Sequence, residues 1–476
     1  MNSAIGRGLR RAFLPVFLLT LGGCEGDVVF REPSPFEQPP AGAGDFLGYS
    51  SVETKRTVCG NCHVGKQAAW QQTAHASAFG SLAASGAAQA VCEGCHTVNA
   101  RGNVSTAESA GWLATKNDRY KDVQCESCHG PGLTHVMNPD MPGTKPLATL
   151  AVGVDLSRGC GQCHSGAHQP FAEEWSTSGH ARFVAYRATN VACIGCHEAK
   201  GVLQAWGVNS TFMVETGENQ HLTITCAVCH DPHDRRNPAQ LRFLIDAAST
   251  EHNLCMKCHQ RRSVPDVASA SGPHSPEGPL LLGEAGWFPP NFEYPPGALV
   301  GSHGSDRNPR LCATCHVNGY EVRDQVTNAF TFRATGHSFQ AIPCVGADGL
   351  PDGNASCELT ARSFRSCTGC HLTETAARSA YAVAELRIAR LTAEIAGLLA
   401  RIPASEFVAS DNRYTTAEGS RFNMQLAQKK GSIAHNPFLL EGLLLASIRQ
   451  IETDYGIKPS MGLSLRAELE TPPGVQ

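Results

Sequence analysis

The feature that most constrains this chain is a five-residue pattern, Cys-x-x-Cys-His, that occurs nine times between residues 59 and 371. The pattern uses eighteen of the 21 cysteines, so almost all of the cysteine in the chain serves it. We number the motifs 1 to 9 in chain order. They are Cys59-Cys62-His63, Cys92-Cys95-His96, Cys125-Cys128-His129, Cys160-Cys163-His164, Cys193-Cys196-His197, Cys226-Cys229-His230, Cys255-Cys258-His259, Cys312-Cys315-His316 and Cys367-Cys370-His371.

Each motif presents two thiols three residues apart and a histidine next to the second thiol. Two thiols at that spacing can both bond to one edge of a haem, and the adjacent histidine then binds the iron. A zinc site needs four ligands gathered from two half-sites, and a redox Cys-x-x-Cys pair normally occurs once on a thioredoxin-like frame. Neither explains a histidine after every second cysteine. The motifs therefore predict nine covalently attached haem c groups.

An iron that only carries electrons has a second axial ligand, usually another histidine and sometimes a methionine. Eleven histidines lie outside the motifs, which is enough for nine second ligands with two to spare. We predict that these ligands are His75, His135, His168, His180, His233, His252, His274, His303 and His337. His221 and His435 are the expected spares. Methionine at one site is left open, with Met137, Met213 and Met256 nearest to motifs.

Three of the predicted ligands share a local pattern, aromatic-x-x-Ser/Thr-Ala/Gly-His-small. It surrounds His75, His180 and His337. The aromatic ring can pack beside a porphyrin, and the small residues let the backbone approach its face. His274 and His303 lie in residues 260–311, the longest interval without a motif. This interval is rich in proline and glycine, and we interpret it as a wrapping segment that delivers both ligands.

The first 24 residues predict export. Three arginines precede a short apolar stretch, residues 13–21, and the sequence then reads Leu21-Gly22-Gly23-Cys24. Small residues before a cysteine are typical of a bacterial lipoprotein signal, with residues 1–23 removed and Cys24 acylated; an ordinary secretory signal cleaved nearby is the alternative. We expect an exported protein in the periplasm or on the outer cell surface, anchored by lipid to a bacterial membrane.

Cys344 and Cys357 are the two cysteines that neither the motifs nor the lipid signal uses. They are thirteen residues apart in a stretch rich in glycine, aspartate and asparagine. An oxidising compartment favours a disulfide between them, and a pair of free thiols is the alternative.

The remaining composition divides the chain and indicates its fold class. Residues 24–57 hold four prolines and few large apolar residues, so they predict a flexible tether. Residues 58–375 hold every motif, and the porphyrins would supply most of the core there. Residues 376–476 predict a helical segment that packs on this core. The fold class is therefore mainly α with extensive irregular loops and C-terminal helices.

Two apolar stripes define the predicted C-terminal helices. The first, closed by Pro403, consists of Val383, Leu386, Leu391, Ile395, Leu398 and Ile402. The second consists of Leu440, Leu444, Ile448, Ile451 and Tyr455. For the second helix we predict Asn436 as N-cap, Pro437 at the first helical position and Gly456 just beyond the end.

Over residues 58–375 the sequence resembles multihaem cytochromes c. This group includes the tetrahaem cytochrome of hydroxylamine oxidation, octahaem tetrathionate and nitrite reductases, and decahaem electron-conduit cytochromes. The resemblance rests on Trp-x-x-Thr-Ala-His-Ala at His75, on Cys-Glu-Ser-Cys-His-Gly-Pro-Gly-Leu-Thr-His ending at His135, on Cys-Ala-Val-Cys-His-Asp-Pro-His ending at His233, and on His-Asn-Leu-Cys-Met-Lys-Cys-His beginning at His252. It implies second-ligand roles at those positions and closely spaced haems that pass electrons.

The resemblance leaves three functions open. The first is an electron carrier of anaerobic respiration that exchanges electrons with envelope redox proteins. The second is an enzyme acting on a small nitrogen or sulfur compound at one five-coordinate haem; the Cys-x-x-Cys-Lys motif common in pentahaem nitrite reductases is absent from the sequence. The third is a homo-oligomer, such as a subunit of a conductive filament. A net charge of −4 argues against a nucleic-acid partner.

Overall fold

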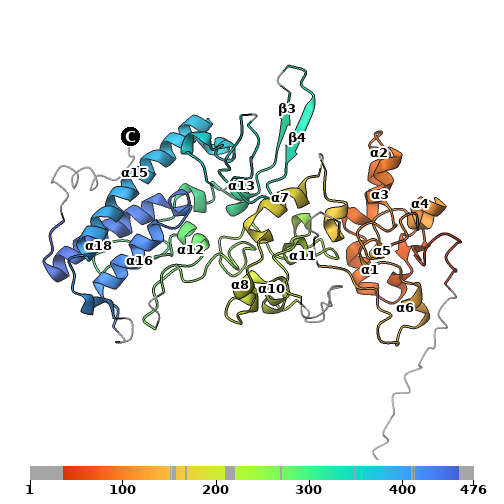
Figure 1. The fold of residues 1–476 in the computed structure, drawn as a ribbon, viewed down its shortest axis with the longest axis horizontal. Helices are drawn as coiled ribbons and strands as arrows, with labels where there is room; N and C mark the ends of the chain where they lie inside the picture. The colour runs from red at the N-terminus through yellow and green to blue at the C-terminus, as the bar shows by residue number, and fades with distance from the viewer. Residues whose placement is uncertain are drawn as a thin grey trace, which may run out of the picture. The chain divides into compact units, whose positions relative to one another are not determined.

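Helical turns form at the cysteine motifs themselves, and longer loops connect them (Figure 1). The computed structural model describes residues 36–459 except 151, 153–156, 167–168, 209–219, 269–270, 325, 348, 355, 409–410 and 412. The signal segment, Cys24, His168 and Met213 therefore lie outside the described residues. Helices that contain motif residues are α3 (Glu93–His96), α5 (Cys125–His129), α9 (Ile194–His197), α11 (Cys226–Cys229), α13 (Cys312–His316) and α14 (Thr368–His371).

The other elements before residue 374 are short. The helices are α1 (Val64–Trp70), α2 (Ala78–Ala84), α4 (Trp112–Thr115), α6 (Leu133–Met137), α7 (Phe171–Thr177), α8 (Ala185–Thr189), α10 (Ala199–Ala205) and α12 (Glu277–Leu281). Two antiparallel hairpins accompany them: β1 (Tyr49–Ser51) with β2 (Arg56–Thr57), and β3 (Tyr320–Arg323) with β4 (Phe330–Ala334). This mainly helical chain with irregular loops confirms the predicted fold class.

The prediction of a flexible tether over residues 24–57 is wrong for its last part. Phe46 and Leu47 are fully buried, and β1 begins two residues later. The buried carboxylate of Glu126 accepts the backbone N–H groups of Leu47, Gly48 and Gly132 at 2.7–3.0 Å. These bonds hold the segment that precedes motif 1 against motif 3. Residues 24–57 contain few large apolar residues, but Phe46, Leu47 and Tyr49 are buried.

Three long helices form a separate apolar core at the C-terminal end (Figure 1, blue). They are α15 (Glu374–Leu399), α16 (Thr416–Ala427) and α18 (Pro437–Tyr455), with the short α17 (Ser432–His435) before the last. Leu280 and Ala285, from the interval 260–311, are also fully buried in this core. Asn436 donates to the carbonyls of Leu280 and Leu299 at 3.2 and 2.7 Å. The wrapping interval is therefore fastened to the C-terminal helices.

The predicted caps of the last helix are confirmed. The Asn436 side chain accepts the Leu439 N–H, Pro437 is the first helical residue, and Gly456 adopts the left-handed conformation that ends the helix. The first predicted stripe is partly wrong. Val383 and Leu386 are 58% and 55% exposed, whereas Leu391, Ile395 and Leu398 are buried as expected. Apart from Ala377, the buried residues of α15 begin at Ile388.

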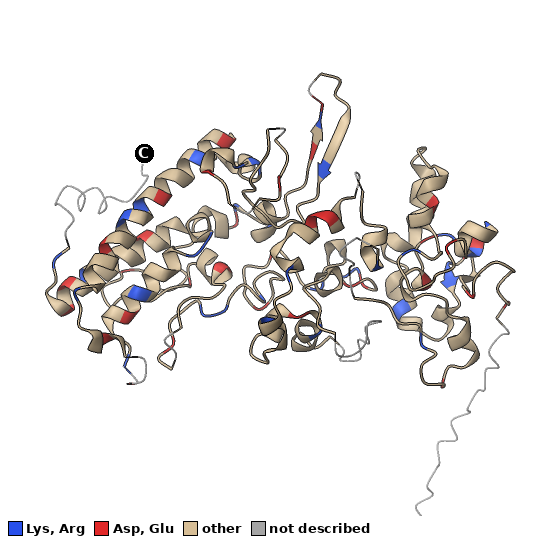
Figure 2. Cartoon of the chain, in the orientation of Figure 1, with Lys and Arg blue, Asp and Glu red and all other residues tan. Residues whose placement is uncertain are grey.

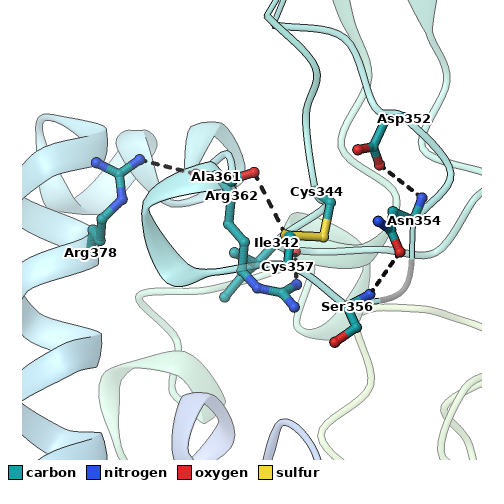
Figure 3. The surroundings of a disulfide bond; sticks show 9 residues. All are labelled: Ile342, Cys344, Asp352, Asn354, Ser356, Cys357, Ala361, Arg362 and Arg378. Carbon is teal, nitrogen blue, oxygen red and sulfur yellow. Dashed lines mark hydrogen bonds between the residues drawn. A yellow bond between two sulfur atoms is a disulfide. The ribbon is translucent and has the colours of Figure 1, made fainter.

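Cys344 and Cys357 form a disulfide, as predicted (Figure 3). The Arg362 side chain donates to the Ile342 carbonyl at 3.1 Å. Arg378 of α15 donates to the Arg362 carbonyl at 3.0 Å. The disulfide-closed loop is thus tied to the start of the C-terminal helices.

A C344S/C357S double variant is expected to lose about 3 kcal/mol of unfolding free energy, because the disulfide no longer restricts a loop of this length in the unfolded chain. Chemical denaturation of the holoprotein measures the loss. A Ser356→Ala variant in the same loop is the control, since the bond of Ser356 to Asn354 uses its backbone N–H and not its side chain. Equal midpoints for the double variant and the wild type would contradict the expectation.

Charges of both signs are interspersed along the chain, including along α15 (Figure 2). In the part of the chain that the structure describes, every helix is too short or too polar to span a bilayer.

Candidate haem-binding site

Histidines from outside the motifs lie opposite motif histidines at a nearly constant spacing. Seven such pairs occur among the described residues, with ring centres 6.0–6.3 Å apart. The pairs, each with its motif histidine second, are His75–His164, His233–His129, His180–His259, His274–His197, His337–His230, His303–His371 and His435–His316.

This spacing fits a metal ion between two imidazoles. An ion bound by one nitrogen of each ring at about 2 Å, with about 1.1 Å from that nitrogen to its ring centre, separates the centres by about 6 Å. Ordinary contacts between aromatic rings scatter over about 4.5–7 Å, whereas all seven histidine pairs fall within 6.0–6.3 Å. Among the described residues, no three His, Cys, Asp or Glu side chains gather as they would around a bare metal ion. The zinc alternative therefore finds no support, whereas paired axial ligands fit.

Four of the paired histidines have a pKa well below 7, which suits an iron ligand, because the ligand must be neutral. Burial lowers the pKa of His75, His180, His337 and His435 to about 4, with a smaller contribution from the facing histidine. Each ring therefore keeps a lone pair on one nitrogen.

The structure brings six of the nine predicted second ligands to a motif histidine. They are His75, His180, His233, His274, His303 and His337. His435, expected to be a spare, lies against His316 instead, because α17 delivers it from the C-terminal core. His135 lies 3.5 Å from the Thr144 hydroxyl, and His252 lies 3.1 Å from the Ser249 hydroxyl. Neither shows the 6 Å ring relation to a motif histidine within the described part of the chain, and neither does the exposed His221.

Two motifs, 1 and 2, have no such ring partner among the described residues. Their histidines are His63 and His96. The Nδ1 atom of His96 lies 2.8 Å from the Ala78 carbonyl, which directs its other nitrogen away from the backbone. His168, which lies outside the described residues, remains a predicted second ligand together with His135 and His252.

The shared pattern around His75 and His180 forms the same two hydrogen bonds in both copies. The Trp70 indole N–H donates to the Val123 carbonyl at 3.0 Å, and the Val123 N–H donates to the His75 carbonyl at 3.1 Å. In the second copy, Trp175 donates to Ile224 at 2.9 Å, and Ile224 donates to His180 at 3.2 Å. Val123 and Ile224 each stand two residues before a motif, so the tryptophan fixes the histidine to the entry of motif 3 or motif 6.

The third copy of the pattern lacks an indole N–H, because its aromatic residue is Phe332. Glu174 on α7 holds this copy instead. Its carboxylate accepts the N–H groups of Thr335 and His337 at 2.7 Å each and the Thr335 hydroxyl at 2.8 Å. The segment that follows β4 is therefore fixed to the helix after motif 4.

None of the eighteen motif cysteines, all of them among the described residues, is used in a disulfide, so each can bond to a haem. Cysteines of different motifs also lie in hydrogen-bonding contact with each other. These contacts are Cys59–Cys125, Cys95–Cys163, Cys160–Cys226, Cys196–Cys258 and Cys255–Cys312. Because each cysteine marks the edge of its porphyrin, these contacts bring the edges of two cofactors together.

Other motif cysteines are near enough to influence each other electrostatically, without a hydrogen bond. These pairs are Cys128–Cys160, Cys229–Cys255 and Cys315–Cys367. The motifs therefore follow one another in the order 1, 3, 4, 6, 7, 8, 9. Motif 2 lies beside motif 4, and motif 5 lies beside motif 7.

Comparison with known proteins gives two family matches. Residues 58–130 match the family described as cytochrome c554 and c-prime, and residues 220–263 match the doubled CXXCH motif. No curated protein and no solved structure matches the chain. The matched segments cover motifs 1 to 3 and motifs 6 and 7, and at motifs 3, 6 and 7 a second histidine lies at the spacing of a pair of iron ligands. The chain is a multihaem c-type cytochrome, with haem c bound covalently at its CXXCH motifs.

Proposed function

We propose that the protein is an exported, lipid-anchored nonahaem cytochrome that relays electrons between redox proteins of the cell envelope. The continuous series of motif contacts carries this proposal. A relay requires every cofactor to lie near another, and the cysteine contacts connect all nine motifs without a break. Haem supplies the chemistry, because its iron changes reversibly between the ferric and ferrous states.

The chain's own residues hold the irons in a state suited to this task. The seven facing pairs would hold seven of the irons, each through one motif histidine and one second histidine. An iron with both positions filled by histidine exchanges electrons with little change of geometry and offers no place for a substrate. This ligation supports electron transfer over catalysis at motifs 3 to 9.

A second function is favoured by one observation, which is that motifs 1 and 2 have no facing histidine among the described residues. An open position at one of these irons would bind a small nitrogen or sulfur compound. The other motifs would then supply it with electrons. His135, His168 and His252 are the histidines that would close both positions.

Low-temperature EPR of the fully oxidised holoprotein, with the haem number from the intact mass, separates the two functions. Nine haems that are all low-spin are the result expected for the relay. A high-spin signal that shifts on adding nitrite, hydroxylamine or a sulfur oxyanion would overturn it in favour of the enzyme. A mass that corresponds to fewer haems would contradict the nonahaem assignment.

The partners follow from the proposed location. Acylated Cys24 would hold the protein at a bacterial membrane, and redox proteins of the envelope would serve as electron donor and acceptor. Each haem adds two propionates, so the holoprotein is more acidic than its sequence and fits partners with basic docking surfaces. Association with further copies of the chain remains part of this proposal, and the molecular mass in solution measures it.

A further inference from the structure

Six of the fourteen paired histidines face a neutral hydrogen-bonding group. Backbone carbonyls accept from His129, His230, His316, His303 and His435, at Pro146, Ala239, Phe339, Ala434 and Gly431, over 2.6–3.0 Å. The Gln169 side chain faces His164. Three paired histidines instead have a carboxylate near Nδ1: His233 opposite motif 3, His259 of motif 7 and His337 opposite motif 6. The Asp231 carboxylate near His233 lies 3.5 Å away and is paired with Arg242 at 3.0 Å, which offsets its charge.

The carboxylate behind His259 belongs to Glu277, the first residue of α12. Its Oε2 atom lies 3.1 Å from Nδ1 of His259. The next residue, Gly278, donates its N–H to the His259 carbonyl at 2.8 Å. The same turn therefore contacts both the ring and the backbone carbonyl of His259. A side chain at Gly278 would collide with that carbonyl, because a Cβ atom there would come within 2.8 Å of it. Only glycine lets Glu277 stand this close.

The 3.1 Å separation places the Glu277 carboxylate where it can accept the Nδ1 proton of His259. An ionised carboxylate has no proton to give, so Nδ1 of His259 must be the donor.

The carboxylate behind His337 acts through a hydroxyl group. The Thr335 Oγ1 atom lies 2.8 Å from Glu174 Oε2 and 3.0 Å from His337 Nδ1. A hydroxyl has one proton, and Thr335 donates it to the carboxylate. Nδ1 of His337 must therefore donate to the Thr335 oxygen. The negative charge of Glu174 is passed on to the imidazole through one intervening hydroxyl.

We infer that Glu277 and the Glu174–Thr335 pair lower the reduction potentials of the haems at motifs 7 and 6. A carboxylate that accepts the Nδ1 proton makes the imidazole more electron-rich and a stronger ligand, which favours the more positive ferric iron. Motifs 6 and 7 are neighbours in the middle of the series. The two central haems of the relay would then be harder to reduce than if their histidines donated to backbone carbonyls.

This inference rests on the proposed function for the ligand roles of His259 and His337, and a redox titration tests it separately. The variants are E277Q, which keeps an acceptor but removes the charge, and T335V, which removes the hydroxyl while Glu174 keeps both backbone bonds. T335S restores the hydroxyl. The controls are Glu284→Gln, an exposed carboxyl seven residues after Glu277, and Thr331→Val on the exposed face of β4.

In E277Q and in T335V we expect one of the haem components to move to a higher midpoint potential. At a fixed potential the ferrous-to-ferric ratio of that component should rise at least tenfold, which is about 59 mV for a one-electron couple. The two control variants and T335S should titrate like the wild type. Unmoved potentials in both variants, with EPR showing unchanged ligands, would overturn the inference and leave the relay intact. A wild-type protein whose haems do not exchange electrons would contradict the relay instead, whatever the variants show.

Discussion

Replacing Leu391 by aspartate is expected to unfold the C-terminal helical core. Leu391 is fully buried among the apolar side chains of α15, α16 and α18. The substitution removes a large apolar side chain and places a charge among apolar side chains. The two effects together cost more than about 5 kcal/mol. A loss of that size equals the whole stability of many domains. Chemical denaturation followed by far-UV circular dichroism measures it.

The same helix provides a matched control. Leu386 is 55% exposed on α15, and its replacement by aspartate should change the unfolding free energy by no more than about 0.5 kcal/mol. A second readout connects the core to the haem site. His435 precedes α18, and the Ala434 carbonyl accepts from His303 at 2.6 Å, so loosening the helices should release both histidines. High-spin EPR signals should appear in the Leu391 variant and not in the Leu386 variant. Equal stability of the two variants would contradict the assignment of the core.

Replacing His435 by alanine is expected to convert one haem from low spin to high spin, because its ring is the one that faces His316 across the 6.2 Å gap. The change should appear as a single high-spin component, with the other haems unaffected. His221→Ala is the control, since His221 is exposed and pairs with no motif histidine within the described residues. His435→Met should keep the haem low-spin and raise its midpoint potential, as a methionine ligand does in other cytochromes c. A low-spin spectrum in His435→Ala would show that another group fills this position.

The local features of the protein were predictable because they are encoded by neighbouring residues. The attachment motifs, the caps at Asn436 and Gly456, and the disulfide all depend on spacing within a few turns of chain. The hydrophobic stripe of α15 was predictable only in its second half. Periodicity indicates that a helix has an apolar face, but it does not say how much of that face a partner helix covers, and at Leu386 none does.

The pairing of histidines was not predictable, because it is a property of the assembled chain. His75 follows motif 1 in the sequence but faces His164 of motif 4. His435 lies far beyond the last motif, in a helical segment whose apolar pattern predicts helix packing and gives no sign of iron binding. The acceptors behind His259 and His337 were equally hidden. Glu174 and Glu277 belong to segments with no recognisable motif, and only the folded chain brings them to the rings.

The position of His435 after all nine motifs has a consequence for how the protein is made. If the chain is exported from its N-terminus, the attachment sites emerge first and the residue that faces motif 8 emerges last. Until α17 and the helices around it have arrived and folded, that haem lacks its second histidine and the stretch from motif 8 to motif 9 is incomplete. A prematurely terminated chain would therefore carry its haems but reveal itself by an exposed iron. The iron at motif 8 would therefore distinguish a complete chain from one that lacks its C-terminus.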